Sequence, residues 1–251
     1  MPQIDLNSDI GELEGDAGRA LDAEILKTVT SCNIACGGHA GDDVSMAATL
    51  RLARDGGILV GAHPSYPDKE GFGRRAMEMP LSELKQSLTD QVRALQTLAA
   101  AEGVSVRHMK PHGALYNEAA KSQPLSECIC DVLTETGISV LFGPPNSKLE
   151  TEAEKHGLRF LAEGFVDRAY EADGSLVSRS LPGAVHKDVS LMTDQAMALA
   201  RSGEVNTLAG KRISLPVQTL CLHGDTSGAA EIARTVKAHL IDQGIEVKAY
   251  A

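Results

Sequence analysis

The chain is 251 residues long, a length at which α/β barrels commonly form one domain, and we expect residues 1–251 to form a single catalytic domain. Hydrophobic residues make up 43% of the sequence and charged residues 23%, so the chain can bury a core and is not intrinsically disordered. The formal net charge is −10 and no basic patch interrupts it, which excludes nucleic acid and anionic membranes as expected partners.

The first residues lack the basic and apolar regions of a secretion signal, and no segment approaches the roughly 18 apolar residues that a membrane span needs. The five cysteines are odd in number and form no CxxC pair, which favours reduced thiols over disulfides. We therefore expect a cytoplasmic protein that does not contact a membrane. The sequence leaves assembly into homo-oligomers open.

Short apolar segments rich in β-branched residues alternate with longer segments of helical periodicity, which is typical of βα units around a parallel sheet. The expected strands are Ile4–Asn7, Cys32–Ala35, Ile58–Ala62, Arg107–Lys110, Ser139–Phe142, Arg159–Glu163 and Thr219–His223. The clearest helices are expected over Leu81–Glu102 and Thr226–Gln243, and a last short strand over Ile245–Ala249. Together these elements predict an α/β barrel.

Two stretches rich in Gly, Arg and small residues, Gly71–Met79 and Asp167–Gly183, interrupt the alternation and are expected to be long loops. Loops of this length in a compact domain usually serve function, and on a barrel they would lie over the site. The segment Thr207–Leu215, with a turn at Ala209-Gly210, is expected to be a peripheral hairpin.

Ionisable or amide side chains occur at the ends of six of the seven expected strands, and only Ser139–Phe142 has none. In chain order these residues are Asp5, Asn7 and Asp9; Asn33 and His39; His63; Lys110 and His112; Glu163, Asp167 and Arg168; and His223 and Asp225. The carboxyl ends of parallel barrel strands converge, so these groups should meet in one concavity. A single such residue is more often a helix cap, as Asp42 and Asp225 could be, but the repetition favours a site.

Histidine and carboxylate side chains suit two kinds of chemistry, and the spacing alone does not choose between them. Asp9, His39, His63 and His112 are candidate ligands for a divalent metal, although no HExxH motif is present. The metal-free alternative is general acid and base catalysis, with Lys110 neutralising a developing anion. The residues expected to be catalytic are Asp9, Glu12, His39, His63, Lys110, His112 and His223.

Substrate anchoring is expected from polar side chains near the same strand ends and from the loop Gly71–Met79. Lys110 could also hold a substrate carboxylate or form a Schiff base, and Arg74 and Arg75 suit a carboxylate or a phosphate. The residues expected to bind substrate are Asn7, Asn33, Asp42, Arg74, Arg75, Tyr116, Glu163, Asp167, Arg168 and Asp225. The sequence has no P-loop, no GxGxxG after the first strand and no GxSxG elbow, so nothing supports a nucleotide site or a serine hydrolase.

At these same residues the sequence resembles the LamB/YcsF family. The matching segments are Asp5-Leu6-Asn7-Ser8-Asp9-Ile10-Gly11-Glu12, Asn33 to Asp42, Gly61-Ala62-His63-Pro64, Gly71-Phe72-Gly73-Arg74-Arg75, Lys110-Pro111-His112-Gly113-Ala114-Leu115-Tyr116, Asp167-Arg168-Ala169-Tyr170, Ser178-Arg179 and His223-Gly224-Asp225-Thr226. They span nearly the whole chain in order. Ser8 and Gly38 depart from the pattern, in which a Cys and a bulky aromatic are expected. Ser8 argues against a thiol mechanism, and Gly38 is expected to leave room beside His39.

The resemblance implies a distorted TIM-like (β/α)7 barrel, similar to the glycoside hydrolase/deacetylase superfamily. It implies hydrolytic opening of the lactam of 5-oxo-L-proline to L-glutamate, driven by ATP as co-substrate, together with two partner subunits, B and C. A second hypothesis is a metal-dependent deacetylase or amidase that acts alone. A non-enzymatic binding scaffold is disfavoured, because a binding pocket rarely needs so many titratable groups.

Overall fold

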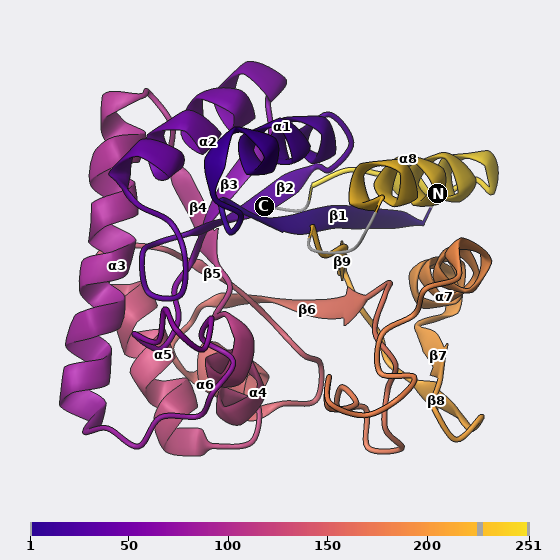
Figure 1. The fold of residues 1–251 in the computed structure, drawn as a ribbon. Helices are drawn as coiled ribbons and strands as arrows, with labels where there is room; N and C mark the ends of the chain where they lie inside the picture. Colours follow the sequence, from indigo (N-terminus) through magenta and orange to yellow (C-terminus); the bar gives the residue numbers. More distant parts are fainter. Residues whose placement is uncertain (1, 225–227, 250–251) are drawn as a thin grey trace.

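Seven parallel strands close into a barrel that helices surround (Figure 1). The computed structural model describes residues 2–224 and 228–249. The barrel order is β1-β2-β3-β4-β5-β6-β9, and β9 pairs with both β6 and β1 to close the ring. The strands are β1 Gln3–Ile10, β2 Ser31–Ala35, β3 Leu59–His63, β4 Val106–Met109, β5 Val140–Gly143, β6 Arg159–Phe165 and β9 Thr219–Cys221. The predicted distorted TIM-like barrel is confirmed.

The helices follow the strands, as repeated βα units require. They are α1 Gly15–Leu26, α2 Asp43–Gly56, α3 Leu81–Ala101, α4 Gly113–Ala119, α5 Gln123–Thr136, α6 Lys148–Lys155, α7 Val189–Ser202 and α8 Ala229–Asp242. Both helices predicted in detail are present, α3 over nearly its whole expected range and α8 from Ala229 onward. Thr226 lies outside the described residues. In the part of the chain that the structure describes, no helix has the length and apolar character to cross a bilayer.

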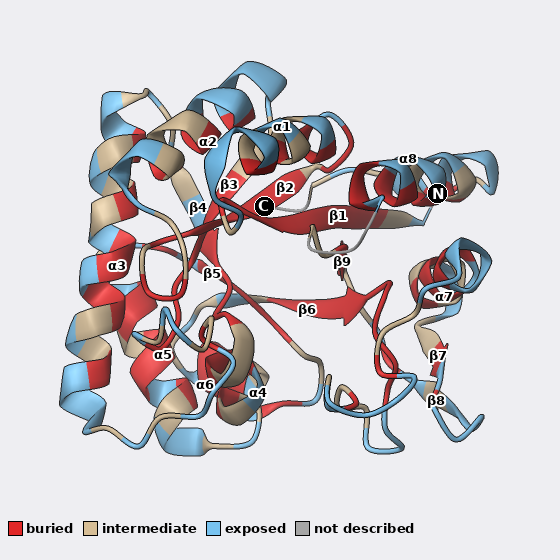
Figure 2. Cartoon of the chain, viewed as in Figure 1, coloured by how far each residue is buried: buried red, intermediate tan, exposed pale blue. Residues whose placement is uncertain are grey.

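The barrel wall separates an apolar layer from a polar interior. Along β1, Leu6 and Ile10 belong to the main apolar core, whereas Asp5, Asn7 and Asp9 hydrogen bond to side chains of other strands. This is the alternation of a pleated strand, in which successive side chains point to opposite faces. Both faces are buried, and Figure 2 shows the strands as the buried centre of the molecule.

The strand without ionisable residues, β5, packs the apolar part of the interior. Val140 and Phe142 of β5 form a small cluster with Leu161 of β6. The ring of His108 stacks on Phe142 with ring centroids 4.1 Å apart. Opposite this ring, a Cβ atom at Gly61 would lie 2.2 Å from the imidazole, so only glycine fits where β3 passes His108. The polar side chains nearer the site therefore pack above a closely packed apolar layer inside the barrel.

The two long loops lie where the sequence predicted them, whereas the hairpin begins at Glu204 and not at Thr207 as expected. Residues 71–79 contain no helix or strand, and residues 167–183 contain only isolated bridges. The predicted hairpin is formed by β7 Glu204–Asn206 and β8 Arg212–Ser214, which pair with each other and not with the barrel. The last strand is shorter than expected, since β10 covers Glu246–Val247 and pairs with β1 outside the ring. All five cysteines are free and buried.

Candidate active site

A pocket of about 360 Å³ opens at the carboxyl ends of the barrel strands, and both long loops contribute to its wall. Its lining includes many of the residues that the sequence predicted for the site. They are Asp9, Glu12, His63, Arg74, Lys110, His112, Tyr116, Arg168 and His223. Strand ends that are far apart in the sequence are therefore brought together, as the parallel barrel requires.

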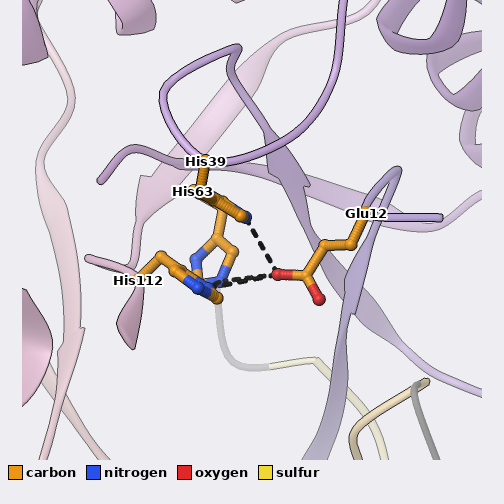
Figure 3. Close-up of side chains that lie close together, drawn as sticks. All are labelled: Glu12, His39, His63 and His112. Carbon is orange, nitrogen blue, oxygen red and sulfur yellow. Dashed lines mark hydrogen bonds and ion pairs between the residues drawn. The ribbon is translucent and has the colours of Figure 1, made fainter. Parts of the chain in front are cut away.

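Glu12 lies at the centre of three histidines (Figure 3). Its Oε1 atom is 3.0 Å from Nε2 of His39, 3.1 Å from Nδ1 of His112 and 3.7 Å from Nε2 of His63. The rings of His39 and His112 stack with centroids 3.6 Å apart. Glu12 follows the end of β1, whereas the histidines follow β2, end β3 and follow β4. The ligand atoms of these four residues all lie within 4.8 Å of one another.

Hydrogen bonds on the far sides of two rings fix their protonation. Nδ1 of His63 faces the carbonyl oxygen of Lys110 at 2.7 Å, and Nε2 of His112 faces the carbonyl oxygen of Phe72 at 2.9 Å. A carbonyl only accepts, so each of these nitrogens carries the hydrogen and the other nitrogen of the neutral ring is an acceptor. Those two acceptors, Nε2 of His63 and Nδ1 of His112, are 3.0 Å apart. Facing acceptors beside a carboxylate are stabilised by a positive charge between them, either a proton or a metal ion.

The protonation preferences of the three histidines differ. Burial lowers the pKa of His39 to about 4 and also lowers that of His112, in spite of their contacts with Glu12. Burial acts in the same direction on His63, but the Asp9 carboxylate, whose Oδ2 is 3.4 Å from Nε2, outweighs it and raises the pKa. If no metal is bound, His63 is therefore the ring that carries the extra proton.

Lys110 is buried between two carboxylates. Its Nζ atom is 2.9 Å from Oδ1 of Asp9 and 2.9 Å from Oε1 of Glu163, and its side chain is only 2% exposed. Burial disfavours the charged amine, but the neighbouring Asp9 and Glu163 raise its pKa well above the ordinary value. Lys110 is therefore a fixed ammonium ion. This argues against the Schiff base considered from the sequence, which needs a neutral amine.

A network of amides extends this ionic group into the barrel. Asn33 donates to Asp9 Oδ1 at 2.8 Å and to Asn7 Oδ1 at 2.8 Å, and Asn7 donates to Glu163 at 3.0 Å. His108 Nε2 faces Asn33 Oδ1 at 2.9 Å. Asn7, Asn33 and Glu163, which were predicted to bind substrate, thus hold Asp9 and Lys110 in place from the interior. Fixed partners of this kind keep reacting groups in a single geometry.

Glu12 is positioned by the turn after β1. The backbone N–H of Gly11 donates to Oδ2 of Asp22 on α1 at 3.0 Å. Burial raises the pKa of Asp22 to about 6, although this hydrogen bond acts in the opposite direction. The pKa of Asp22 in the folded state lies above the unfolded value near 3.8. At pH values between the two, the folded protein keeps a proton on Asp22 that the unfolded chain has lost. Stability from this group is present at low pH and is lost as the pH rises through about 6.

Replacing Asp22 by asparagine should therefore stabilise the protein at neutral pH. Asparagine keeps an acceptor oxygen for Gly11 but has no charge to bury, and we expect a gain of about 2 kcal/mol at pH 7.5 and almost none at pH 4. Thermal unfolding followed by circular dichroism at both pH values measures it. Asp16→Asn, at an exposed position of the same helix, is the matched control. An equal gain at both pH values would contradict this account of Asp22.

His223, which follows β9, is held by Asp167. Nδ1 of His223 is 2.8 Å from Oδ2 of Asp167, and the ring stacks on Phe165 with centroids 5.4 Å apart. Burial opposes ionisation of Asp167, but the adjacent His223 outweighs it and lowers the pKa of the carboxyl. Asp167 orients His223 so that Nε2 faces away from it, and His223 lines the pocket.

Comparison with known proteins places this site in a family. The family model described as the LamB/YcsF family matches residues 4–251. The chain belongs to the LamB/YcsF family. A relative from Campylobacter jejuni strain 81-176, named as the A subunit of 5-oxoprolinase, is 42% identical and covers 98% of this chain and 97% of its own. A relative of the same name from Acinetobacter baylyi is 43% identical over 99% and 98% of the two chains.

A solved structure shows the same fold in the family. The crystal structure of a lactam utilization protein from Thermus thermophilus matches with a TM-score of 0.91 and 37% identity, covering 99% of this chain and all of the other. The sequence resemblance to the LamB/YcsF family is thereby confirmed over the full length of the motifs.

Two residues predicted to bind substrate lie elsewhere. Asp42 is exposed and caps α2, because its Oδ1 accepts from the backbone N–H of Ser45 at 2.7 Å. Arg75 pairs with Asp68, and its side chain is 61% exposed. Neither residue lines the pocket, since Asp42 is held by Ser45 of α2 and Arg75 by Asp68 of its own loop. Asp225 lies outside the described residues.

The two departures from the family pattern are both well packed. The hydroxyl of Ser8 donates to the carbonyl of Leu222 at 2.6 Å, and so fixes β1 to the segment that carries His223. Gly38 does not leave free space beside His39, contrary to the expectation from the sequence. A Cβ atom there would lie 2.4 Å from Oε1 of Gln91, which hydrogen bonds to both backbone groups of Ser65.

Replacing Gly38 by alanine should accordingly destabilise the protein and displace His39. We expect a loss of about 2 kcal/mol, as is typical of overpacking at a buried position. Chemical denaturation measures the free energy of unfolding. The control is Gly56→Ala, at the last residue of α2. The added Cβ would lie 3.3 Å from a side-chain carbon of Ile58, so we expect the free energy of unfolding to change by less than about 1 kcal/mol. Comparable stability of the two variants would show that Gln91 can move aside.

Three residues near the pocket were missing from the predicted site. His108 supports Asn33, and Cys221 Sγ lies 3.1 Å from Nζ of Lys110. Arg179 lines the pocket from the loop 167–187. His108 lies on β4, two residues before Lys110. Side chains two residues apart on a strand point to the same face, and this period of two was the available signal for His108. Arg179 had only the family motif Ser178-Arg179 as a signal, because the path of a long loop depends on the fold.

Proposed function

We propose that the chain is the A subunit of a 5-oxoprolinase, which opens the lactam of 5-oxo-L-proline to L-glutamate in a reaction coupled to ATP hydrolysis. The observation that carries the proposal is the group of Glu12, His63 and His112, which lines the pocket. The relatives with which the chain shares its family are named as the A subunit of 5-oxoprolinase. These side chains are general acids and bases, as the hydrolysis of a cyclic amide requires. The sequence-based alternative, a deacetylase or amidase that acts alone, is not favoured by these names.

The roles of the residues follow from their partners. Glu12 is the candidate general base, because its carboxylate contacts His39 and His112 and lines the pocket. His63, which carries the extra proton when no metal is bound, is the candidate acid for the ring nitrogen that leaves. The ammonium of Lys110 lines the same pocket beside Asp9 and is placed to stabilise negative charge on the carbonyl oxygen. His223, which lines the same pocket, is a second candidate proton donor.

The residues present also fit a divalent metal ion. Three imidazoles and one carboxylate are the donors that Zn and related first-row ions prefer, and the facing acceptor nitrogens of His63 and His112 call for a cation. Glu12, His39, His63 and His112 would hold it, with Glu12 in the place for which the sequence suggested Asp9, while Asp9 belongs to a second group of potential ligands with Cys221 and His223. A bound metal would polarise the lactam carbonyl and lower the pKa of a water molecule. Asp9 then serves to hold Lys110.

Coupling to ATP indicates work shared with other subunits. Opening an unstrained five-membered lactam is unfavourable near neutral pH, so an energy source is needed, yet the sequence contains no P-loop or GxGxxG motif. The relatives are named as one subunit of an enzyme. We propose that partner subunits B and C complete the ATP-dependent part of the reaction in the cytoplasm, and that this barrel supplies the hydrolytic site.

The substitution His112→Ala tests this proposal. It removes the ring that faces the proton donor His63 and one contact of Glu12, so ATP-dependent glutamate release by the chain reconstituted with its partner subunits should fall on the order of 10³-fold. His156→Ala, at the residue that caps the C-terminus of α6 and away from the pocket, is the matched control and should retain full activity. Circular dichroism of both variants confirms that they are folded. Wild-type turnover in folded His112→Ala would overturn the assignment.

A further inference from the structure

Phe72 has a backbone conformation that bulky residues rarely adopt. Its φ angle is 54°, in the left-handed region, and of the described residues other than glycine Asn146 is the one other with a positive φ. The backbone N–H of Gly73 donates to the carbonyl oxygen of Asp68 at 2.8 Å, and that of Phe72 donates to the carbonyl oxygen of Lys69 at 3.2 Å. These two bonds form a Schellman motif, in which glycine usually takes the position that Phe72 has here. Backbone strain of this kind is concentrated at functional sites, where the surroundings hold it.

The ring of Phe72 packs against the two stacked histidines. Its centroid lies 5.2 Å from that of His39 and 5.4 Å from that of His112, with interplanar angles of 77° and 80°. These are edge-to-face contacts, which aromatic rings favour. The guanidinium group of Arg74 lies over the ring, 4.8 Å from its centroid. The side chain therefore anchors residue 72 to the histidine group, which a glycine at this position could not do.

The carbonyl oxygen of Phe72 determines which nitrogen of His112 carries the hydrogen. It lies 2.9 Å from Nε2, and a carbonyl only accepts, so Nε2 donates. Nδ1 is then an acceptor, 3.1 Å from Oε1 of Glu12 and 3.0 Å from Nε2 of His63. The other tautomer would leave Nε2 and the carbonyl oxygen as two facing acceptors, which is unfavourable. The backbone of residue 72 thus selects the tautomer that presents an acceptor to the site.

The residue after Phe72 is packed against the start of α4, which His112 precedes. The carbonyl oxygen of Gly73 accepts from the backbone N–H of Ala114 at 2.9 Å. A Cβ atom at Gly113 would lie 2.5 Å from that same oxygen, and a Cβ atom at Gly73 would lie 2.9 Å from Cδ2 of His112. Because the turn is held at Gly73, the direction of the Phe72 carbonyl depends on the conformation of residue 72 itself.

We propose that Phe72 is a positioning residue for His112. Its ring holds residue 72 in the left-handed conformation, and its carbonyl oxygen thereby keeps the hydrogen of His112 on Nε2 and leaves Nδ1 as an acceptor. Phe72 is not among the residues that line the pocket, so it acts through His112 and not on the substrate. Its effect on the reaction rests on the proposed function, whereas its effect on the tautomer does not.

Two substitutions separate the ring from the backbone. Phe72→Ala removes the ring but keeps a Cβ atom that disfavours a positive φ, whereas Phe72→Gly removes the ring and adopts a positive φ without strain. We expect kcat for ATP-dependent glutamate release to fall on the order of 10²-fold in Phe72→Ala and less than about tenfold in Phe72→Gly. KM should stay within about twofold of the wild-type value, because no contact with the substrate is lost. Phe72→Gly should also resist denaturant better than Phe72→Ala, which reverses the order of the two residues at ordinary positions.

Heteronuclear NMR of the imidazole nitrogens reads the tautomer of His112 directly. It is recorded on the isolated chain after a chelator has removed any bound metal, and the His112 signals are those that His112→Ala lacks. The wild type and Phe72→Gly should show a single tautomer with the hydrogen on Nε2, and Phe72→Ala a mixture of both tautomers. A ring that only stabilises the fold would change the denaturation midpoint and leave the tautomer unaltered.

Asn146→Ala is the matched control, since Asn146 also has a positive φ but does not line the active-site pocket. It should lose stability and keep the wild-type kcat and the His112 tautomer. If Phe72→Ala does not fold, Phe72→Leu takes its place, because it keeps the strain and lacks the ring. A wild-type tautomer in the folded Ala or Leu variant, or a kcat for Phe72→Gly no higher than theirs, overturns the proposal. Absence of glutamate release by the wild type with its partners would refute the proposed function, and the tautomer result would stand.

Discussion

Glu12→Gln should lower ATP-dependent glutamate release on the order of 10³-fold while leaving the protein folded. The glutamine keeps the shape of the side chain, but it cannot accept a proton from water, and its amide nitrogen brings donors into a group of acceptors. Oε1 of Glu12 is the atom on which His39 and His112 converge, so no other described carboxylate occupies its position (Figure 3). Initial rates with the reconstituted subunits measure the loss.

The matched control is Glu14→Gln, two residues away, at an exposed position that makes no capping hydrogen bond to α1. It should retain wild-type activity. Metal analysis of the same preparations identifies the cation at the site. A divalent metal in stoichiometric amount in the wild type, and much less of it in Glu12→Gln, assigns the metal to the four ligands. If the wild type is fully active without a metal, the positive charge between His63 and His112 is the proton on His63.

Lys110→Met should cause the largest loss of stability among single substitutions at the site. Methionine fits the space, but it leaves the carboxylates of Asp9 and Glu163 buried and facing each other without their ammonium ion. Removing one partner of a buried ionic group typically costs about 3–5 kcal/mol. Denaturant titration gives the free energy of unfolding, and Lys85→Met on α3, whose ion pairs are at the surface, should cost less than about 1 kcal/mol.

A double substitution distinguishes an ionic role from a packing role of Lys110. Lys110→Met combined with Glu163→Gln removes one of the unpaired charges, so part of the lost stability should return. If the double variant is less stable than Lys110→Met by the full cost of Glu163→Gln alone, the two side chains do not interact energetically. Such additivity would refute the ionic account.

The barrel was predictable from the sequence because its signals are local. Short apolar segments between helical segments predicted the strands, and polar residues at successive strand ends, among them Asp5, Asn7 and Asp9, predicted one pocket. The boundaries were less predictable, since β1 continues to Ile10 and so brings Glu12 to the histidines. That extension depends on pairing with β2, in which Asp9 and Ile10 are opposite Asn33 and Ile34.

The errors arose where local partners decide the role of a polar residue. Asp42 could be a cap or a ligand from the sequence, and the Ser45 side chain completes the capping box. Arg75 could not be separated from Arg74 without knowing that the turn brings Asp68 to it. Gly38 was predicted to open space, but Gln91, far away in the sequence, fills it. Residue type and spacing predicted which chemistry is present, and long-range packing determined which side chains take part in it.

We propose that this barrel is the hydrolytic subunit of an ATP-driven lactam hydrolase. The most direct measurement is glutamate release from 5-oxo-L-proline by the chain alone and with its partner subunits, each with and without ATP. We expect glutamate only when the partners and ATP are both present, and none when Glu12→Gln replaces the wild-type chain. Release by the chain alone without ATP, or undiminished release by the complex that contains Glu12→Gln, would contradict the account.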